Sequence, residues 1–273
     1  MKIKLLLISV LCLLSFSLCA ATKPDSIMTY KEVDGHSLNL HIFTPQKHLA
    51  SENKPAIVFF FGGGWIGGKP EQFYKQSQYL AKRGMVAISA EYRIKNTHGT
   101  SPKEALRDAK SAIRWVRAQS NDLGIDPNKI VAAGASAGGQ LAAATATSIG
   151  FNEATDDVKI SARPNALVLF NPVIDNGPSG YGFNRVEDYW QDFSPMHNIS
   201  DNMPPTILFL GTKDKLIPVS TAKKFKAKVE EQSGRCELHL YPNQPHGFFN
   251  VKKYNETLQA TDQFLVSLGF IKE

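Results

Sequence analysis

The stretch that most constrains this chain runs from residue 130 to residue 144, where an apolar segment ends in Gly-Ala-Ser-Ala-Gly and an alanine-rich segment follows. The apolar residues predict a buried strand, the glycines a sharp turn, and the alanines a helix. On such a turn a serine is held in a strained conformation, and glycines two residues to either side let the strand and the helix pass closely. Ser136 is therefore predicted to expose its Oγ as a nucleophile. The alternative from this stretch alone is a structural serine in a glycine-rich turn.

The composition is that of a globular protein with a large core. The chain has 273 residues, of which 42% are hydrophobic and 21% charged, which suits one α/β domain. Its formal net charge is +6, but it contains no run of five or more basic residues. The densest basic cluster is Lys223, Lys224, Lys226 and Lys228, whose spacing is typical of the wet face of a helix. This distribution argues against nucleic acid as a partner.

The first twenty residues predict an export signal. Lys2 and Lys4 precede an apolar stretch over residues 5–18, and Ala20 and Ala21 follow as small residues suited to cleavage. The apolar stretch is short for a membrane span, so a permanent anchor is the less favoured alternative. We therefore expect a secreted or periplasmic protein whose mature chain has no membrane span.

Cleavage at this point would divide the chain into a signal peptide, residues 1–20, and an α/β domain, residues 22–273. It would also remove Cys12 and Cys19, so that Cys236 would be the only cysteine of the mature chain and no internal disulfide could form. A lipid attached to Cys19 is the less favoured alternative, because a bulky leucine precedes it where a small residue would be expected.

The order of predicted elements indicates an α/β fold: a mostly parallel sheet flanked by helices on both faces. A hairpin over residues 27–42, with an Asp-Gly turn, is expected first. Buried strands are then predicted at 55–61, 85–89, 130–135, 166–170, 206–210 and 237–241. Helices are predicted at 71–83, from a Ser101–Glu104 capping box onward, after Ser136, and at 220–232 and 254–268. Such alternation pairs the strands in parallel and places catalytic groups at their carboxyl ends.

A serine nucleophile needs a base, and the base needs a group that orients it. His246 follows the last predicted strand in a Pro-His-Gly loop, whereas the other histidines lie in the hairpin, in polar loops, in the connection after residue 175 or inside a strand. Asp214 follows the strand at 206–210 and stands between the serine and the histidine in the chain. A catalytic triad of Ser136, Asp214 and His246 is therefore predicted. Asp175, which trails the preceding strand, is the rival acid.

A glycine triplet after the strand at 55–61 predicts the site where a tetrahedral intermediate would be stabilised. Gly62 and Gly63 can bring backbone N–H groups to a substrate oxygen without an intervening Cβ. The N–H of Ala137, the residue after the predicted nucleophile, should complete this oxyanion hole. A phosphate-binding loop would need a Gly-Lys-Ser/Thr sequence, which is absent here. The predicted chemistry requires no cofactor and no metal ion.

Together these motifs resemble the α/β-hydrolase superfamily, close to its hormone-sensitive-lipase-like and small carbohydrate-esterase groups. Residues 62–65 resemble the family's oxyanion motif, 134–138 its nucleophile elbow, 204–214 its acid-bearing segment and 245–248 its histidine loop. The resemblance covers nearly all of the predicted mature chain and implies the α/β-hydrolase fold and ester hydrolysis. In one departure, Phe61 occupies the place of a family histidine that is implied to order the oxyanion loop. We expect Phe61 to hold this loop by packing against a neighbouring strand or Trp65.

The substrate is predicted from what could cover the site. The hairpin begins close to the predicted cleavage site, so we expect no helical roof before the sheet. The connection over residues 175–205 is the other available cover, and its aromatic residues are Tyr181, Phe183, Tyr189, Trp190 and Phe193. These rings either stack on sugar or aromatic acyl groups or pin the connection to the core. An open cleft and export favour acetylated or feruloylated carbohydrate esters, with amide, peptide or formamide hydrolysis and a non-catalytic binding module as alternatives.

Overall fold

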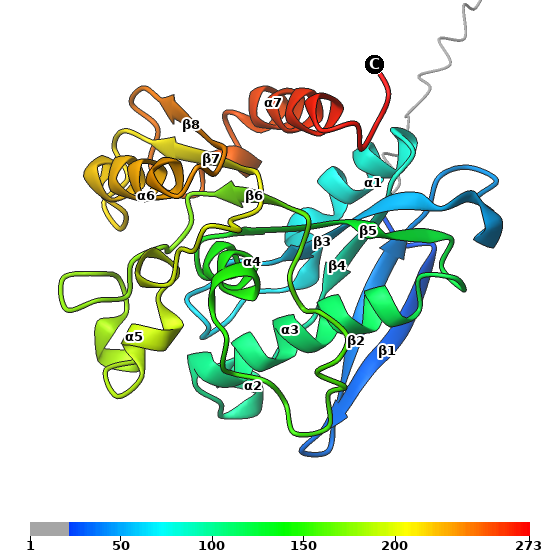
Figure 1. Cartoon of the computed structure of the whole chain (residues 1–273), viewed down its shortest axis with the longest axis horizontal. Helices are drawn as coiled ribbons and strands as arrows, with labels where there is room; N and C mark the ends of the chain where they lie inside the picture. The colour runs from blue at the N-terminus through cyan, green and yellow to red at the C-terminus, as the bar shows by residue number, and fades with distance from the viewer. Residues whose placement is uncertain (1–21) are drawn as a thin grey trace, which may run out of the picture.

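An eight-stranded sheet runs through residues 22–273, the part of the chain that the computed structural model describes (Figure 1). The predicted signal peptide lies outside the described residues. The strands are β1 (Ser26–Val33), β2 (His36–Phe43), β3 (Lys54–Phe60), β4 (Val86–Ala90), β5 (Ile125–Ala135), β6 (Ala166–Phe170), β7 (Thr206–Gly211) and β8 (Cys236–Tyr241). The α-helices are α1 (Tyr74–Lys82), α2 (Lys95–His98), α3 (Pro102–Ala118), α4 (Ala137–Thr147), α5 (Trp190–Phe193), α6 (Val219–Glu231) and α7 (Tyr254–Ser267). None of the helices within residues 22–273 has both the length and the apolar character needed to cross a bilayer.

The strand order across the sheet is β1-β2-β4-β3-β5-β6-β7-β8. The first two strands form an antiparallel hairpin, β2 pairs antiparallel with β4, and all later pairs are parallel. At the hairpin turn Asp34 and Gly35 have φ angles of 52° and 76°, the backbone that an Asp-Gly two-residue turn favours. The predicted mostly parallel sheet is therefore confirmed, and its parallel strands direct their carboxyl ends to one edge.

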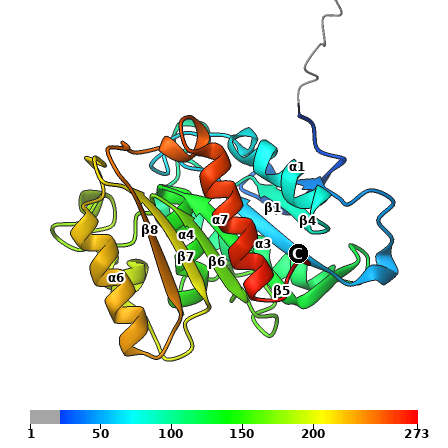
Figure 2. The ribbon, with the colours of Figure 1, turned by 90° about the horizontal axis from the view of Figure 1, so that it is seen from above.

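Helices cover both faces of the sheet, as predicted. Helices α3, α4 and α6 contribute to one hydrophobic core, and α1 and α7 contribute to the other. Figure 2 looks onto the face that α1 and α7 cover. Along β3, Val58 and Phe60 point into the first core, whereas Ile57 and Phe59 point into the second. This alternation explains why a continuous apolar run forms a central strand, since every side chain enters one core or the other.

The helix predicted over residues 71–83 begins differently from the expectation. Its first turn is a 3₁₀ helix, η2 (Pro70–Phe73), and the α-helix α1 starts only at Tyr74. Phe73 is fully buried and stacks on Phe59 with ring centroids 4.7 Å apart, while Ser89 Oγ donates to Pro70 O at 2.6 Å. These contacts fasten the tight turn to the sheet and bring Gln72 close to the end of β3.

A buried ion cluster joins the hairpin to α3. The carboxylate of Asp108 is fully buried and accepts hydrogen bonds from Lys31 Nζ at 2.7 Å and from Arg93 Nη2 at 2.8 Å. Glu153 lies 2.8 Å from both cations. Burial disfavours the charged form of Arg93, but the hydrogen bonds and charges of Asp108 and Glu153 together outweigh it and raise the pKa of the guanidinium. The opposite charges thus stabilise one another near the turn of the hairpin, where Arg93 also contacts Asp34.

Candidate active site

The strand-to-helix turn at Ser136 is as tight as the glycine pattern predicts. Ser136 lies between β5 and α4 with a φ of 53°, a strained value for a residue with a side chain. A Cβ added at Gly134 would lie 2.2 Å from the backbone oxygen of Gly138. A Cβ added at Gly138 would lie 2.1 Å from the backbone oxygen of Phe60. Since no such contacts are tolerated, glycine is required at both positions for the strand and the helix to pass.

The structure brings the three predicted triad residues into one hydrogen-bonded chain. Ser136 Oγ lies 2.9 Å from His246 Nε2, and His246 Nδ1 lies 2.7 Å from Asp214 Oδ2. The Asp214 side chain is fully buried, and its other oxygen accepts the N–H groups of Leu216 and Ile217 at 2.8 and 3.0 Å. These two bonds fix the carboxylate so that Oδ2 faces the imidazole. The residues follow β5, β7 and β8, whose carboxyl ends meet at this edge of the sheet.

Asp175, the rival acid, forms a hydrogen bond within its own loop. Its Oδ1 accepts the N–H of Gly177 at 2.9 Å, a bond that closes a turn two residues long. Within residues 22–273 no hydrogen bond joins Asp175 to His246, whereas Asp214 lies against the imidazole. The geometry therefore favours Asp214 as the partner of the histidine.

Asn171, which sequence reasoning did not single out, also contacts the histidine. It follows β6, is buried, and has a φ of 35°. Its Oδ1 accepts the N–H of Gly247 at 3.3 Å, and its Nδ2 lies 3.2 Å from His246 Nε2. Because the backbone N–H must face Oδ1, the amide presents its NH₂ group to Nε2. This contact favours the tautomer with the proton on Nδ1 and the lone pair on Nε2, the form that can accept a proton from Ser136.

One predicted oxyanion donor is already occupied. The N–H of Gly62 donates to Gln72 Oε1 at 2.6 Å and is therefore not free for a substrate oxygen. Within residues 22–273 the N–H groups of Gly63 and Gly64 have no acceptor, and Ala137 N–H opens α4 and has no intrahelical acceptor. The prediction that Gly62 donates to the substrate oxygen is therefore wrong, because its N–H already has an acceptor. The free N–H groups near the elbow are those of Gly63, Gly64 and Ala137.

Phe61 packs against Tyr92, which follows β4. The two rings stack with centroids 4.1 Å apart and an interplanar angle of 17°. The hydroxyl of Tyr92 donates to the backbone oxygen of Phe61 at 2.7 Å, and burial raises the pKa of this phenol, so it stays protonated. Phe61 thus stacks on the segment that directly follows the neighbouring strand β4, and not on Trp65, the other partner expected. Trp65 packs instead under the connection that follows β6.

Truncation of this stack provides a prediction. Phe61→Ala removes the ring that fixes the start of the oxyanion loop, so we expect kcat to fall by roughly 10- to 1000-fold. KM should change much less, because the loop acts mainly on charge that develops after binding. Steady-state kinetics on a small activated ester measure both constants. A normal kcat, or a loss confined to KM, would show that Phe61 has no part in shaping the hole.

The aromatic residues between β6 and β7 mostly pin that connection to the core. Phe193 in α5 is fully buried, and its ring centroid lies 5.9 Å from that of Trp65. Tyr181 is half-buried, and the guanidinium of Arg185 lies over its ring, 5.5 Å from the centroid. Arg185 also donates to the backbone oxygen of Gly64 at 2.9 Å. The connection is thus fastened both to the core and to the oxyanion loop.

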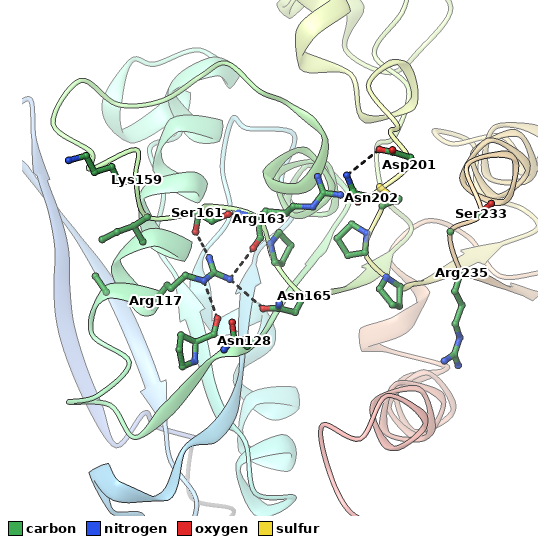
Figure 3. Close-up of a pocket in the computed structure, with 18 residues that line it drawn as sticks. Arg117, Asn128, Lys159, Ser161, Arg163, Asn165, Asp201, Asn202, Ser233 and Arg235 are labelled. Carbon is green, nitrogen blue, oxygen red and sulfur yellow. Dashed lines mark hydrogen bonds between the residues drawn. The ribbon is translucent and has the colours of Figure 1, made fainter.

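A cavity of about 920 Å³ lies away from the triad, near the amino ends of the parallel strands (Figure 3). At its centre the Arg117 guanidinium donates to Asn165 Oδ1 at 3.4 Å and to the backbone oxygen of Arg163 at 2.9 Å. Lys159 and Arg235 point away from this centre (Figure 3). Lys159 and Arg235 therefore do not converge with Arg117 on one point of the cavity. Over residues 22–273 no group of three His, Cys, Asp or Glu side chains is placed to hold a metal ion.

Comparison with protein families gives two matches that together span most of the chain. Residues 40–181, about half of the chain, match the family model BD-FAE. Residues 171–268 match the dienelactone hydrolase family. The first match contains the oxyanion loop and the elbow, and the second contains Asp214 and His246.

Individual relatives agree with these families. Thermogutta terrifontis esterase 2 phosphonylated by cyclosarin is 41% identical with a TM-score of 0.87, covering 91% of this chain and 96% of that chain. Esterase LipC of Mycobacterium tuberculosis is 30% identical over 227 residues, 74% of this chain and 55% of LipC. An acetylxylan esterase of Xylanibacter ruminicola is 27% identical over 235 residues, 80% of this chain and 46% of that protein. The chain thus spans about half the length of these two curated relatives. It belongs to the BD-FAE family and is an esterase of the α/β-hydrolase fold.

Proposed function

We propose that the protein hydrolyses carboxylic esters through an acyl-enzyme on Ser136, with His246 as the base and Asp214 as the group that orients it. The hydrogen-bonded chain from Ser136 Oγ through the imidazole to the buried carboxylate carries this proposal. Nε2 of His246 accepts the hydroxyl proton as Oγ attacks the ester carbonyl, and the carboxylate of Asp214 stabilises the imidazolium that forms.

The oxygen of the attacked carbonyl becomes negatively charged and requires donors. The N–H groups of Gly63, Gly64 and Ala137 supply them, because Ala137 directly follows Ser136, Gly63 follows the glycine that lies against Ser136, and none of the three has an acceptor within the described chain. His246 then donates its proton to the leaving alcohol, which breaks the ester bond and leaves the acyl group on Oγ. Water, deprotonated by the same imidazole, attacks the acyl carbon, releases the carboxylic acid and restores the serine hydroxyl.

For the substrate we propose acylated carbohydrate, carrying acetyl or feruloyl groups, outside the cytoplasm. The match to a protein named acetylxylan esterase supports this class. A cavity of about 350 Å³ borders the oxyanion loop, and its lining includes Thr100, Ser101, Asn184 and Arg185. Such polar groups suit the hydroxyls of a sugar better than a long acyl chain. The export part of the proposal rests on the amino-terminal sequence, and N-terminal sequencing of the mature protein tests it.

A substrate panel tests the proposed class. We expect release of acetate from acetylated xylan or of ferulate from a feruloyl sugar, and a fall in kcat/KM of about tenfold or more between acetyl and octanoyl p-nitrophenyl esters. The Ser136→Ala variant gives the background rate for every substrate. Faster hydrolysis of octanoyl esters, with no acid released from either carbohydrate ester, would contradict the carbohydrate assignment. If an anilide were hydrolysed faster than the matching ester, the protein would be assigned as an amidase and not as an esterase.

A further inference from the structure

The side chain of Gln72 returns to the oxyanion loop from the 3₁₀ turn η2. Its Oε1 accepts the N–H of Gly62 at 2.6 Å, a short and direct hydrogen bond. A Cβ added at Gly62 would lie 3.5 Å from the same Oε1 and 3.3 Å from Ser136 Cβ. The carboxamide of Gln72 is therefore held at the loop segment that touches the nucleophile.

This bond determines how the following glycines are presented. An amide N–H lies in the plane of its peptide, so the acceptor Oε1 fixes the orientation of the peptide that joins Phe61 to Gly62. Gly63 and Gly64 have φ angles of 140° and 64°, and glycine moves readily between such conformations. A fixed peptide before them restricts the directions in which their own N–H groups can point.

The same residue links the oxyanion loop to the histidine loop. The backbone oxygen of Gln72 accepts Asn250 Nδ2 at 2.9 Å, and Asn250 Oδ1 accepts Gln76 Nε2. Asn250 ends the turn η5 (Phe248–Asn250), which begins two residues after His246. The two turns are also packed together, because Phe73 of η2 is fully buried and stacks on Phe249 of η5 with ring centroids 5.6 Å apart. Gln72 thus connects the oxyanion loop to the turn that follows His246.

We propose that Gln72 is a positioning residue for the oxyanion hole. This inference rests on the proposed function, because it assigns a role in stabilising the intermediate formed on Ser136. Tyr92 and Arg185 donate to backbone oxygens of the loop, those of Phe61 and Gly64, whereas Gln72 accepts a backbone N–H of the loop, that of Gly62. The peptide between Phe61 and Gly62 is thus held on both sides, since the Tyr92 hydroxyl donates to its oxygen and Gln72 Oε1 accepts its N–H.

Gln72→Met tests the proposal, because methionine is similar in length but is only a weak acceptor. We expect kcat to fall by about 10- to 100-fold with KM within about threefold of wild type. The inhibition constant of a trifluoromethyl ketone, which forms a tetrahedral oxyanion on the serine, should rise by a similar factor. Gln78→Met is the matched control, since Gln78 is exposed on α1 and should leave all three constants unchanged.

Gln72→Ala is a second variant that also removes Oε1, and the same pattern is expected from it. A folded variant of either kind whose kcat and ketone inhibition both stay within about threefold of wild type would overturn the proposal. So would a loss confined to KM, which would assign Gln72 to substrate binding. Failure of the proposed function is distinguishable, because in that case Ser136→Ala would retain activity whatever Gln72 does.

Discussion

Replacing Ser136 with alanine is expected to abolish ester hydrolysis while leaving the fold intact. The attacking atom is Oγ, and its removal leaves His246 with no hydroxyl to deprotonate at the elbow. Loss of a triad member costs on the order of 10⁴ or more in rate. Alanine fits the same strained turn as serine, since both carry a Cβ at a φ of 53°. Initial rates on p-nitrophenyl acetate and a thermal unfolding curve measure the two effects.

A covalent probe makes this test independent of the substrate. A fluorophosphonate should add one phosphonyl group to the wild-type protein and none to Ser136→Ala, as measured by intact mass. Ser37→Ala is the matched control, because Ser37 is exposed on the hairpin and should affect neither labelling nor turnover. If a contamination-free preparation of Ser136→Ala retained even about a tenth of the wild-type rate, a serine acyl-enzyme could not be the mechanism.

Elements that depend on neighbours in the chain were predictable from the sequence. The elbow is one case, since the need for glycine at Gly134 and Gly138 follows from the passage of one strand and the next helix. The hairpin turn at Asp34 is another, because its two residues determine its backbone. The central strands were predictable because apolar runs bounded by turn signals are long enough to fill both faces of a sheet. Local sequence thus predicted the scaffold and the position of Ser136 on its strand-to-helix turn.

Contacts between distant segments were not predictable in the same way. Whether the N–H of Gly62 is free depends on Gln72, a residue whose side chain folds back from the next turn. Asn171 approaches His246 from the end of a different strand, and no spacing rule connects the two. Asp108 gathers its cations from β1 and from the segment after β4. In each case the partner is chosen by tertiary packing, which a periodic pattern does not encode.

Asp214→Asn is the second variant with a large expected effect, and the surroundings of the carboxylate give the reason. The oxygen that accepts the N–H groups of Leu216 and Ile217 must remain an oxygen in the variant. The new NH₂ group is therefore forced to face His246 Nδ1, which can then only accept. The imidazole proton moves to Nε2, the wrong tautomer for taking a proton from Ser136. We expect kcat to fall by about 10⁴-fold, measured by steady-state kinetics on p-nitrophenyl acetate.

Asp175→Asn is the matched control for this change of charge. Asp175 uses Oδ1 to accept the N–H of Gly177, and an asparagine oxygen can accept the same bond, so the effect on kcat should be less than about threefold. In Asp214→Asn the proton on His246 Nε2 would also face the NH₂ group of Asn171. Two donors would then face each other, and their repulsion would displace the imidazole. Asp214→Asn should therefore lose more than the electrostatic support of the imidazolium. The reverse ranking of the two variants would assign the acid to the end of β6 and would contradict the orientation of His246 seen here.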